Sequence, residues 1–391
     1  MRMPVEGEED CEMNNFKMKT DLRFGEGALD TLKEFPGRNV VIFTDPFMVK
    51  SGAAAHIAQQ LEGCASVEIF GEVRPDPPIE LIVDGLKFLL SKNADVVVAL
   101  GGGSSIDAAK SVVYMAKQTG KLKKVTFVAI PTTSGTGSEV TKFAVITDTK
   151  RGAKYPLVDE ELMPDIAILD AHLVSSAPQT ITADTGCDVI THALEAYVSA
   201  NANDVSDALA EKALELAFIY LPRAYRNGRN EVAREKMHTA SCLAGMAFNA
   251  VSLGVNHSIA HALGAKFHIP HGRANAMLLP HVVEFNANLS GNFGATDEST
   301  ASKKYARIAK LIGLPTPNTH TGVANLVEEL KYLLRMLKIP VTLAEAGVDR
   351  EEYEKLKPDI IQSALKDVCS LTNPRPLSEA DVDSILKNLE S

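Results

Sequence analysis

Short, unbroken hydrophobic runs recur through the first half of the chain, and each ends in a polar or turn-forming residue. Runs of this length, rich in β-branched side chains, are typical of strands buried on both faces, as in a parallel sheet. We predict a strand in each of the segments 39–45, 66–72, 95–103, 125–133 and 165–170.

Between these runs the hydrophobic residues follow helical spacing, for example over 52–63 and 78–93. Strand and helix in alternation predict a doubly wound α/β domain with a mostly parallel sheet. After about residue 180 the strand pattern stops, and segments rich in Ala, Leu and Glu predict an all-α second half. The composition changes near 175–186 without a flexible linker, so the two halves should pack together, with a site where they meet.

A strand, a glycine-rich turn and a helix follow one another over 96–116. Glycines let the backbone approach a bulky anion, and a helix N-terminus offers free N–H groups, so the turn suits a pyrophosphate. The dinucleotide pattern GxGxxG fails at Ser104 and Ile106, and the P-loop pattern fails at Ala109. A structural alternative is that Ser104 caps the helix and Asp107 completes a capping box, which leaves the three glycines unexplained.

Two further polar features lie where parallel strands should end, the place where open α/β sheets bind ligands. The loop over 131–141 is dense in Ser and Thr and suits phosphate and ribose contacts. Asp45 follows the first clear strand and could accept hydrogen bonds from adenosine ribose hydroxyls, which would favour NAD over NADP. The alternatives are a plain surface loop and a turn Asp before Pro46.

Four of the ten histidines gather within residues 254–272, at His257, His261, His268 and His271. His257 and His261 would share one face of a helix, because they are four residues apart. His271 follows a proline and should lie in a turn beyond that helix. Imidazole is a common ligand of transition metals, but buried histidines more often only fill a core.

A second segment strengthens the case for a metal. Asp188 and His192 are also four residues apart, so a helix would place a carboxylate and an imidazole on one face. One carboxylate with three imidazoles suits Fe²⁺ or Zn²⁺. The alternatives are a charge near a helix start for Asp188 and a core residue bonded to a carbonyl for His192.

The overall composition argues against several kinds of binding partner and against a place in the membrane. The formal net charge is −10 with no basic stripe, which argues against nucleic acids and anionic membrane surfaces. The five cysteines are scattered without a CxxC pair, which indicates reduced thiols in a cytoplasmic protein. No hydrophobic run has the length of a transmembrane helix, and the first twenty residues lack the apolar core of a secretory signal.

Taken together, the motifs resemble the iron-dependent (group III) alcohol dehydrogenase family. The family pattern has a GGGSxxD turn, a PTTxGTGSE loop, a DxxxH helix and a later HxxxH followed by a further His. The chain contains GGGSSID, PTTSGTGSEVT, DVITH and HSIAHALGAKFHIPH in this order. The resemblance runs from about Phe16 to the segment 372–377, and Asn256 stands where many relatives carry Cys, at a position that is not a ligand.

The resemblance implies a fold like that of dehydroquinate synthase and group III alcohol dehydrogenases. We expect a flexible tail over 1–15, a dinucleotide-binding α/β domain over 16–184 and an all-helical metal-binding domain over 185–391. The implied metal ligands are Asp188, His192, His257 and His271. The implied contacts of NAD(H) are Asp45, Asp76, Gly102, Gly103, Ser104, Asp107, Thr132, Thr133, Thr136, Thr141, Lys154 and Phe248.

The implied activity is reversible hydride transfer between NAD and a short primary alcohol such as ethanol or 1-propanol, with Fe²⁺ or Zn²⁺ as a Lewis acid. His261 remains without a metal, and we expect it to pass the proton to solvent; its alternative role is to orient a ligand. The segment around 245–282 most resembles 1-propanol and ethanol dehydrogenases of bacterial microcompartments. This predicts a homo-oligomer, contacts with shell proteins, and a tail that serves as a targeting peptide.

Three other functions stay open. Within the family, the substrate could be lactaldehyde with 1,2-propanediol, or 1,3-propanediol. A lyase of the dehydroquinate synthase type is disfavoured. The resemblance implies that enzymes of that group bind their metal through a Glu/His/His set, whereas this chain has an Asp/His/His/His set. A non-catalytic microcompartment component is disfavoured by the intact ligand set.

Overall fold

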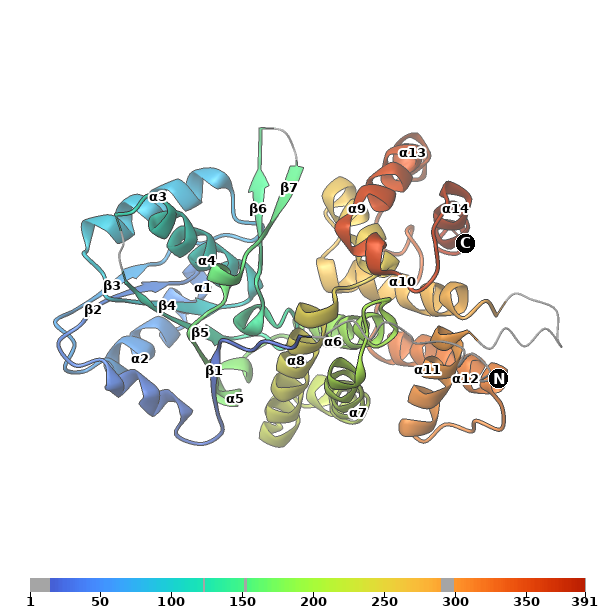
Figure 1. Cartoon of the computed structure of the whole chain (residues 1–391), viewed down its shortest axis with the longest axis horizontal. Helices are drawn as coiled ribbons and strands as arrows, with labels where there is room; N and C mark the ends of the chain where they lie inside the picture. Colours follow the sequence, from blue (N-terminus) through green and yellow to red (C-terminus); the bar gives the residue numbers. More distant parts are fainter. Residues whose placement is uncertain (1–14, 122–123, 151–152, 290–298, 391) are drawn as a thin grey trace, which may run out of the picture.

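The computed structural model describes residues 15–121, 124–150, 153–289 and 299–390. Its two halves lie side by side, an α/β half built from the first part of the chain and a helical half built from the rest (Figure 1). The predicted tail falls almost wholly outside the described residues. Among the described residues no helix combines the length and the apolar character needed to cross a lipid bilayer.

A six-stranded parallel sheet forms the centre of the α/β half, in the order β1-β8-β5-β4-β2-β3. All five predicted strands are present, and one short edge strand, β1, was not predicted. The bounds are β1 Asp21–Phe24, β2 Asn39–Phe43, β3 Ser66–Phe70, β4 Val96–Gly101, β5 Thr126–Pro131 and β8 Ile166–Leu169.

Both faces of the sheet are covered, which explains the unbroken hydrophobic runs. Val41 and Phe43 pack with the core under α3 and α4, whereas Val40 and Ile42 pack with the core under α2. The helices of this half are α1 Pro46–Lys50, α2 Ala53–Gln60, α3 Ile79–Ser91, α4 Gly103–Gln118 and α5 Ala171–Val174, with 3₁₀ helices η1 Ala28–Glu34, η2 Ser138–Val140 and η3 Glu160–Leu162.

A two-stranded antiparallel hairpin, β6 Phe143–Asp148 and β7 Ala153–Val158, was not predicted. It stands between the two halves in Figure 1 and joins their cores. Phe143 packs against the helical core, while Ile146 belongs to the core of the α/β half.

The second half is helical, as predicted, and α6 lies at its centre. Almost every residue of α6 from Thr182 onward is buried. The helices are α6 Gln179–Val198, α7 Asp204–Arg226, α8 Glu231–Val251, α9 Val255–Phe267, α10 His271–Asn286, α11 Thr300–Leu311, α12 Thr319–Met336, α13 Arg350–Lys366 and α14 Glu379–Lys387, with the 3₁₀ helix η4 Val368–Thr372. The fold class is therefore confirmed, while the predicted boundary between residues 184 and 185 falls inside α6.

Candidate active site

The glycine turn meets Asp45 at the point where the strand order reverses. From β2 the chain adds β3 on one side and then β4 on the other, so the carboxyl ends of β2 and β4 lie next to each other. A crevice of this kind is where doubly wound sheets bind ligands. Asp45 caps α1 through one oxygen, which accepts from the N–H groups of Phe47 and Met48. Its other oxygen lies 3.4 Å from Ser105 Oγ, beside the turn.

The capping box predicted as an alternative for this turn is wrong. Helix α4 begins at Gly103, its N-cap is Gly102, and no side chain caps it. Ser104 therefore lies inside the first turn. The Asp107 carboxylate turns away and accepts from Ser138 Oγ at 2.7 Å and from the Val145 N–H at 3.0 Å. The first N–H groups of α4 are thus left without a side-chain cap, the arrangement that a phosphate requires.

The loop over 131–141 packs directly against the glycine turn. A Cβ at Gly103 would lie 2.7 Å from Thr136 Cγ2, and a Cβ at Gly102 would lie 3.3 Å from Thr133. The glycines are thus needed for contact between the two loops, in addition to any ligand. Thr132 and Thr141 are buried, and the Thr141 hydroxyl accepts from Lys110 Nζ at 3.1 Å.

A buried lysine holds the end of this loop. Lys110 is fully buried and donates to the carbonyls of Thr141 and Phe143, each at 2.8 Å. Burial lowers the pKa of Lys110 to about 8, although Asp107 and Glu139 act in the opposite direction. Lys110 therefore anchors the loop between β5 and β6 to α4.

Two other predicted cofactor contacts form an ion pair. Lys154 Nζ on β7 lies 2.6 Å from Asp76 Oδ1. Phe248 on α8 lies elsewhere, because its ring stacks on His192 at a centroid distance of 4.6 Å. The structure places Phe248 directly beside the histidine cluster.

Three helices bring the four predicted metal ligands together. Asp188 and His192 lie on α6, His257 on α9, and His271 at the first residue of α10. One ligand atom from each lies within 4.8 Å of the other three. Two ligands of one ion lie at most about 4.4 Å apart when each bond is about 2.2 Å, so closure around an ion requires shifts of a few tenths of an ångström.

Close approach of two helices makes this grouping possible. A Cβ at Gly272 would lie 2.2 Å from the Asp184 carbonyl oxygen and 3.2 Å from Asp188 Cβ, so only glycine lets α10 begin against α6. Arg273 then pairs with the Asp184 carboxylate at 3.0 Å. His271 is the first residue of α10 and does not lie in a free turn, because Pro270 serves as the N-cap of the helix.

The donor set fits a divalent cation. Burial lowers the pKa of His192 and of His257, so both imidazoles are neutral at pH 7 and offer lone pairs. His192 Nδ1 is buried, has no hydrogen-bond partner among the described residues and lies 3.9 Å from Asp188 Oδ2. Asp188 stands nine residues after the first residue of α6, so the alternative of a charge near a helix start is wrong. An orphaned buried nitrogen facing a carboxylate is what a metal ligand looks like without its ion.

Sequence reasoning missed the residues behind these ligands. Glu195 Oε2 lies 2.5 Å from His257 Nδ1. The Asn275 amide donates to Asp188 Oδ1 at 2.8 Å and lies 3.0 Å from His257 Nε2 and 3.2 Å from His271 Nε2. Helical spacing could have found both residues, because Glu195 is seven positions after Asp188 and Asn275 is four positions after His271.

His261 lies beside the cluster with a carboxylate partner. Its ring stacks on His271 at a centroid distance of 5.3 Å, and its Nδ1 lies 2.9 Å from Asp367 Oδ2. The His261 side chain is 39% exposed. Burial acts to raise the pKa of Asp367, but the hydrogen bond and the charge of His261 outweigh it, so the pKa is lowered.

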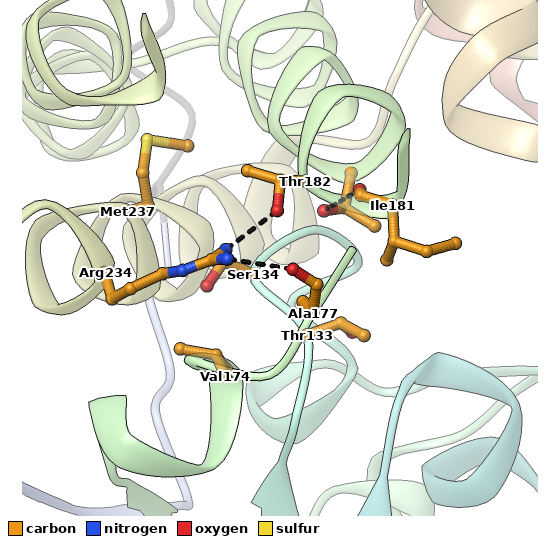
Figure 2. Close-up of a pocket in the computed structure, with 9 residues that line it drawn as sticks. Thr133, Ser134, Val174, Ala177, Ile181, Thr182, Arg234 and Met237 are labelled. Atoms are coloured by element: carbon orange, nitrogen blue, oxygen red, sulfur yellow. Dashed lines mark hydrogen bonds between the residues drawn. The ribbon is translucent and has the colours of Figure 1, made fainter. Parts of the chain in front are cut away.

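A small cavity is lined in part by Thr133 and Ser134 of the loop over 131–141 (Figure 2). The Arg234 guanidinium lies beside it and donates to Thr182 Oγ1 at 2.8 Å and to the Ala177 carbonyl at 3.0 Å. None of the four predicted metal ligands lines this cavity. This cavity is therefore distinct from the histidine cluster.

Comparison with known proteins identifies the family. Residues 19–171 match iron-containing alcohol dehydrogenase, and residues 182–389 match the C-terminal part of the Fe-containing alcohol dehydrogenase family. The chain belongs to the iron-containing alcohol dehydrogenase family. The predicted family and its oxidoreductase activity are thus confirmed.

Three proteins illustrate the similarity. The 1-propanol dehydrogenase PduQ of Citrobacter freundii is 44% identical, covering 96% of this chain and 100% of its own. The NADPH-dependent butanol dehydrogenase of Clostridium saccharobutylicum is 37% identical, covering 96% of this chain and 97% of its own. The structure of sulfoacetaldehyde reductase from Bifidobacterium kashiwanohense in complex with NAD⁺ has a TM-score of 0.83 and 27% identity, covering 97% of this chain and 99% of its own.

Proposed function

We propose that this alcohol dehydrogenase interconverts short primary alcohols and aldehydes, with 1-propanol and propionaldehyde or ethanol and acetaldehyde as substrates and NAD(H) as the hydride carrier. The observation that carries the proposal is the group of one carboxylate and three imidazoles within 4.8 Å of one another. The similarity of this chain to a 1-propanol dehydrogenase supports a short alcohol as the substrate.

Asp188, His192, His257 and His271 would hold the cation, which as Fe²⁺ or Zn²⁺ would supply a Lewis acid that stabilises negative charge on the substrate oxygen. The residues of the chain do the rest. The Phe248 ring stacked on His192 gives the cluster an apolar side and excludes water there. His261, held by Asp367, accepts the proton of the alcohol and passes it toward solvent.

We assign the cofactor to the edge of the sheet where β2 and β4 end. The uncapped N-terminus of α4 would receive the pyrophosphate, and the Asp45 oxygen that does not cap α1 would accept from the adenosine ribose in addition to Ser105 Oγ. A carboxylate at this place repels a 2′-phosphate, so NADH should be preferred. A related butanol dehydrogenase is NADPH-dependent, so the preference for NADH has to be measured for this chain, and Asp45 is the position at which we test it.

The test is a paired measurement of metal and activity. The protein is purified anaerobically with Fe²⁺ or Zn²⁺, its metal content is measured, and NADH consumption is followed with propionaldehyde, acetaldehyde and lactaldehyde. We expect one ion per chain and faster turnover with the first two aldehydes than with lactaldehyde. The variant His271→Ala should lose both metal and turnover; normal metal content in this variant would remove His271 from the ligand set.

We further propose a cytoplasmic homo-oligomer that works inside a bacterial microcompartment, with the tail over residues 1–15 as its targeting peptide. The tail lies almost wholly outside the described residues, so the support is the resemblance to microcompartment dehydrogenases. Loss of co-sedimentation with shell proteins after deletion of residues 1–15, with activity retained, is the expected result.

A further inference from the structure

A buried carboxylate lies directly behind the histidine cluster. Glu195 is on α6, one helical turn after His192, and only 3% exposed. Its Oε2 lies 2.5 Å from His257 Nδ1, while the other ring nitrogen of His257 faces Asp188 Oδ1 at 3.8 Å. The imidazole thus stands between one carboxylate on the side of the proposed ion and another on the opposite side.

The second oxygen of Glu195 is also committed. Glu195 Oε1 accepts a hydrogen bond from the Asn256 N–H at 2.7 Å. The N-cap residue of helix α9 is Gly254, which has no side chain to accept hydrogen bonds from the first N–H groups of the helix. A Cβ at Gly254 would lie 2.8 Å from Glu195 Oε1, so this glycine is what lets a carboxylate from another helix reach the start of α9.

We propose that Glu195 is a positioning residue that orients His257 for metal binding by accepting a hydrogen bond from its Nδ1–H while fixing the first turn of α9. The inference rests on the proposed metal site. With Nδ1–H donated to Glu195, the lone pair of Nε2 points toward Asp188, where the ion would lie. A carboxylate behind a ligating histidine also makes the imidazole a stronger ligand.

The chemistry of a carboxylate is needed at this position because two donors converge on it. In the proposed tautomer the Asn256 N–H and the His257 Nδ1–H both require an acceptor, and a carboxylate offers one oxygen to each. A glutamine has one acceptor and one donor end. It can serve only one of the two groups, and it presents an N–H to the other.

Asn373, the residue that follows η4, offers a matched control because it also contacts the start of α9. Its Oδ1 accepts from the Val255 N–H at 3.2 Å, so it caps the same turn of α9 as Glu195 does. It makes no contact with His257 among the hydrogen bonds of the described residues. If Glu195 serves only as a cap, Glu195→Gln and Asn373→Ala should behave alike.

The experiment compares the two variants with the wild-type protein under anaerobic conditions. The affinity for Co²⁺ and for Zn²⁺ is measured by competition with a chromogenic chelator, and the urea midpoint of the metal-free protein is measured separately. We expect Glu195→Gln to lose about 10-fold to 100-fold in affinity. Asn373→Ala should lose stability while its affinity stays within about threefold. Equal affinities in the two variants would overturn the role of Glu195 and leave the proposed function standing.

A second readout needs no variant. In Zn²⁺-loaded wild-type protein labelled with ¹⁵N at histidine, the proton of His257 should be found on Nδ1, with Nε2 carrying the metal. A proton on Nε2 would overturn the proposal even if Glu195→Gln failed to fold. A wild-type protein that binds neither Co²⁺ nor Zn²⁺ would instead overturn the metal site itself, so the two failures are distinguishable.

Discussion

Replacing Gly272 with alanine should dislodge one proposed metal ligand, His271, although no ligand is itself replaced. The added Cβ would lie 2.2 Å from the Asp184 carbonyl oxygen and 2.7 Å from its carbonyl carbon. Ordinary contact requires more than 3 Å, so the start of α10 must move by about 1 Å away from α6. The contact is with backbone inside a buried helix, so the movement falls mainly on α10.

This movement should weaken metal binding because metal–ligand distances vary only within a narrow range. His271 is the residue before Gly272, and metal–ligand distances tolerate only about 0.2 Å. A shift of about 1 Å therefore removes His271 from the ligand set. We expect the affinity for Zn²⁺ or Co²⁺ to fall at least about 100-fold, equivalent to about 2.7 kcal/mol. The fold itself should lose about 1–3 kcal/mol from overpacking.

A glycine far from the cluster gives the matched control. A Cβ at Gly322 on α12 would lie 2.5 Å from Thr316 Cγ2 and 3.0 Å from Ala306 Cβ. Gly322→Ala should therefore lose stability by overpacking but keep the wild-type metal affinity. The assay is chelator competition together with urea unfolding of both variants. Wild-type affinity in Gly272→Ala would refute the reasoning, because it would mean that α10 can yield without moving His271.

Three further predictions concern other parts of the site. His261→Ala should keep its metal but turn over more slowly with a changed pH profile; an unchanged profile in a pH–rate series would remove its proton role. Asp45→Asn, which keeps an acceptor for the cap of α1 but removes the charge, should lower the preference for NADH over NADPH by about tenfold in kcat/KM; an unchanged ratio would contradict the assignment of the ribose. Burial lowers the pKa of His238 to about 4, so the unfolded state binds more protons below pH 6.5 and stability should fall by up to about 3 kcal/mol as the pH drops from 6.5 to 4. His238→Gln should flatten that slope in urea titrations, and equal slopes for the variant and the wild type would count against it.

The strands and the ligand set could be predicted because their signals are local. A strand covered on both faces reads as a continuous apolar run, and β4 is buried at every position. Asp188 with His192 is an i, i+4 pair, which any helix places on one face. Local spacing therefore predicts which residues are ligands, but it does not predict how α6 and α10 pack against each other.

Helical spacing can point to the supporting residues, but their contacts could not be predicted because the partners are far away in the sequence. Glu195 contacts His257 sixty-two residues later, and His261 contacts Asp367 after more than a hundred residues. The hairpin β6–β7 also escaped prediction, since its strands are partly exposed and join two cores instead of lying within one. These features depend on tertiary packing, which no single window of sequence reports.

Two glycines of the loop over 131–141 are needed for packing against the helical half and not for phosphate binding. A Cβ at Gly135 would lie 2.7 Å from Thr185 Cβ on α6, and a Cβ at Gly137 would lie 2.7 Å from Gly245 Cα on α8. Neither position belongs to the N-terminus of α4, where a pyrophosphate would bind. Thr185 lies on the same helix as Asp188, one turn before it, so the loop touches the helix that carries the metal ligands. Because these contacts involve backbone and Cβ atoms rather than flexible side chains, they fix how far the loop over 131–141, which we propose to contact the cofactor, stands from the proposed ion. Hydride transfer depends on how the cofactor is held relative to that ion.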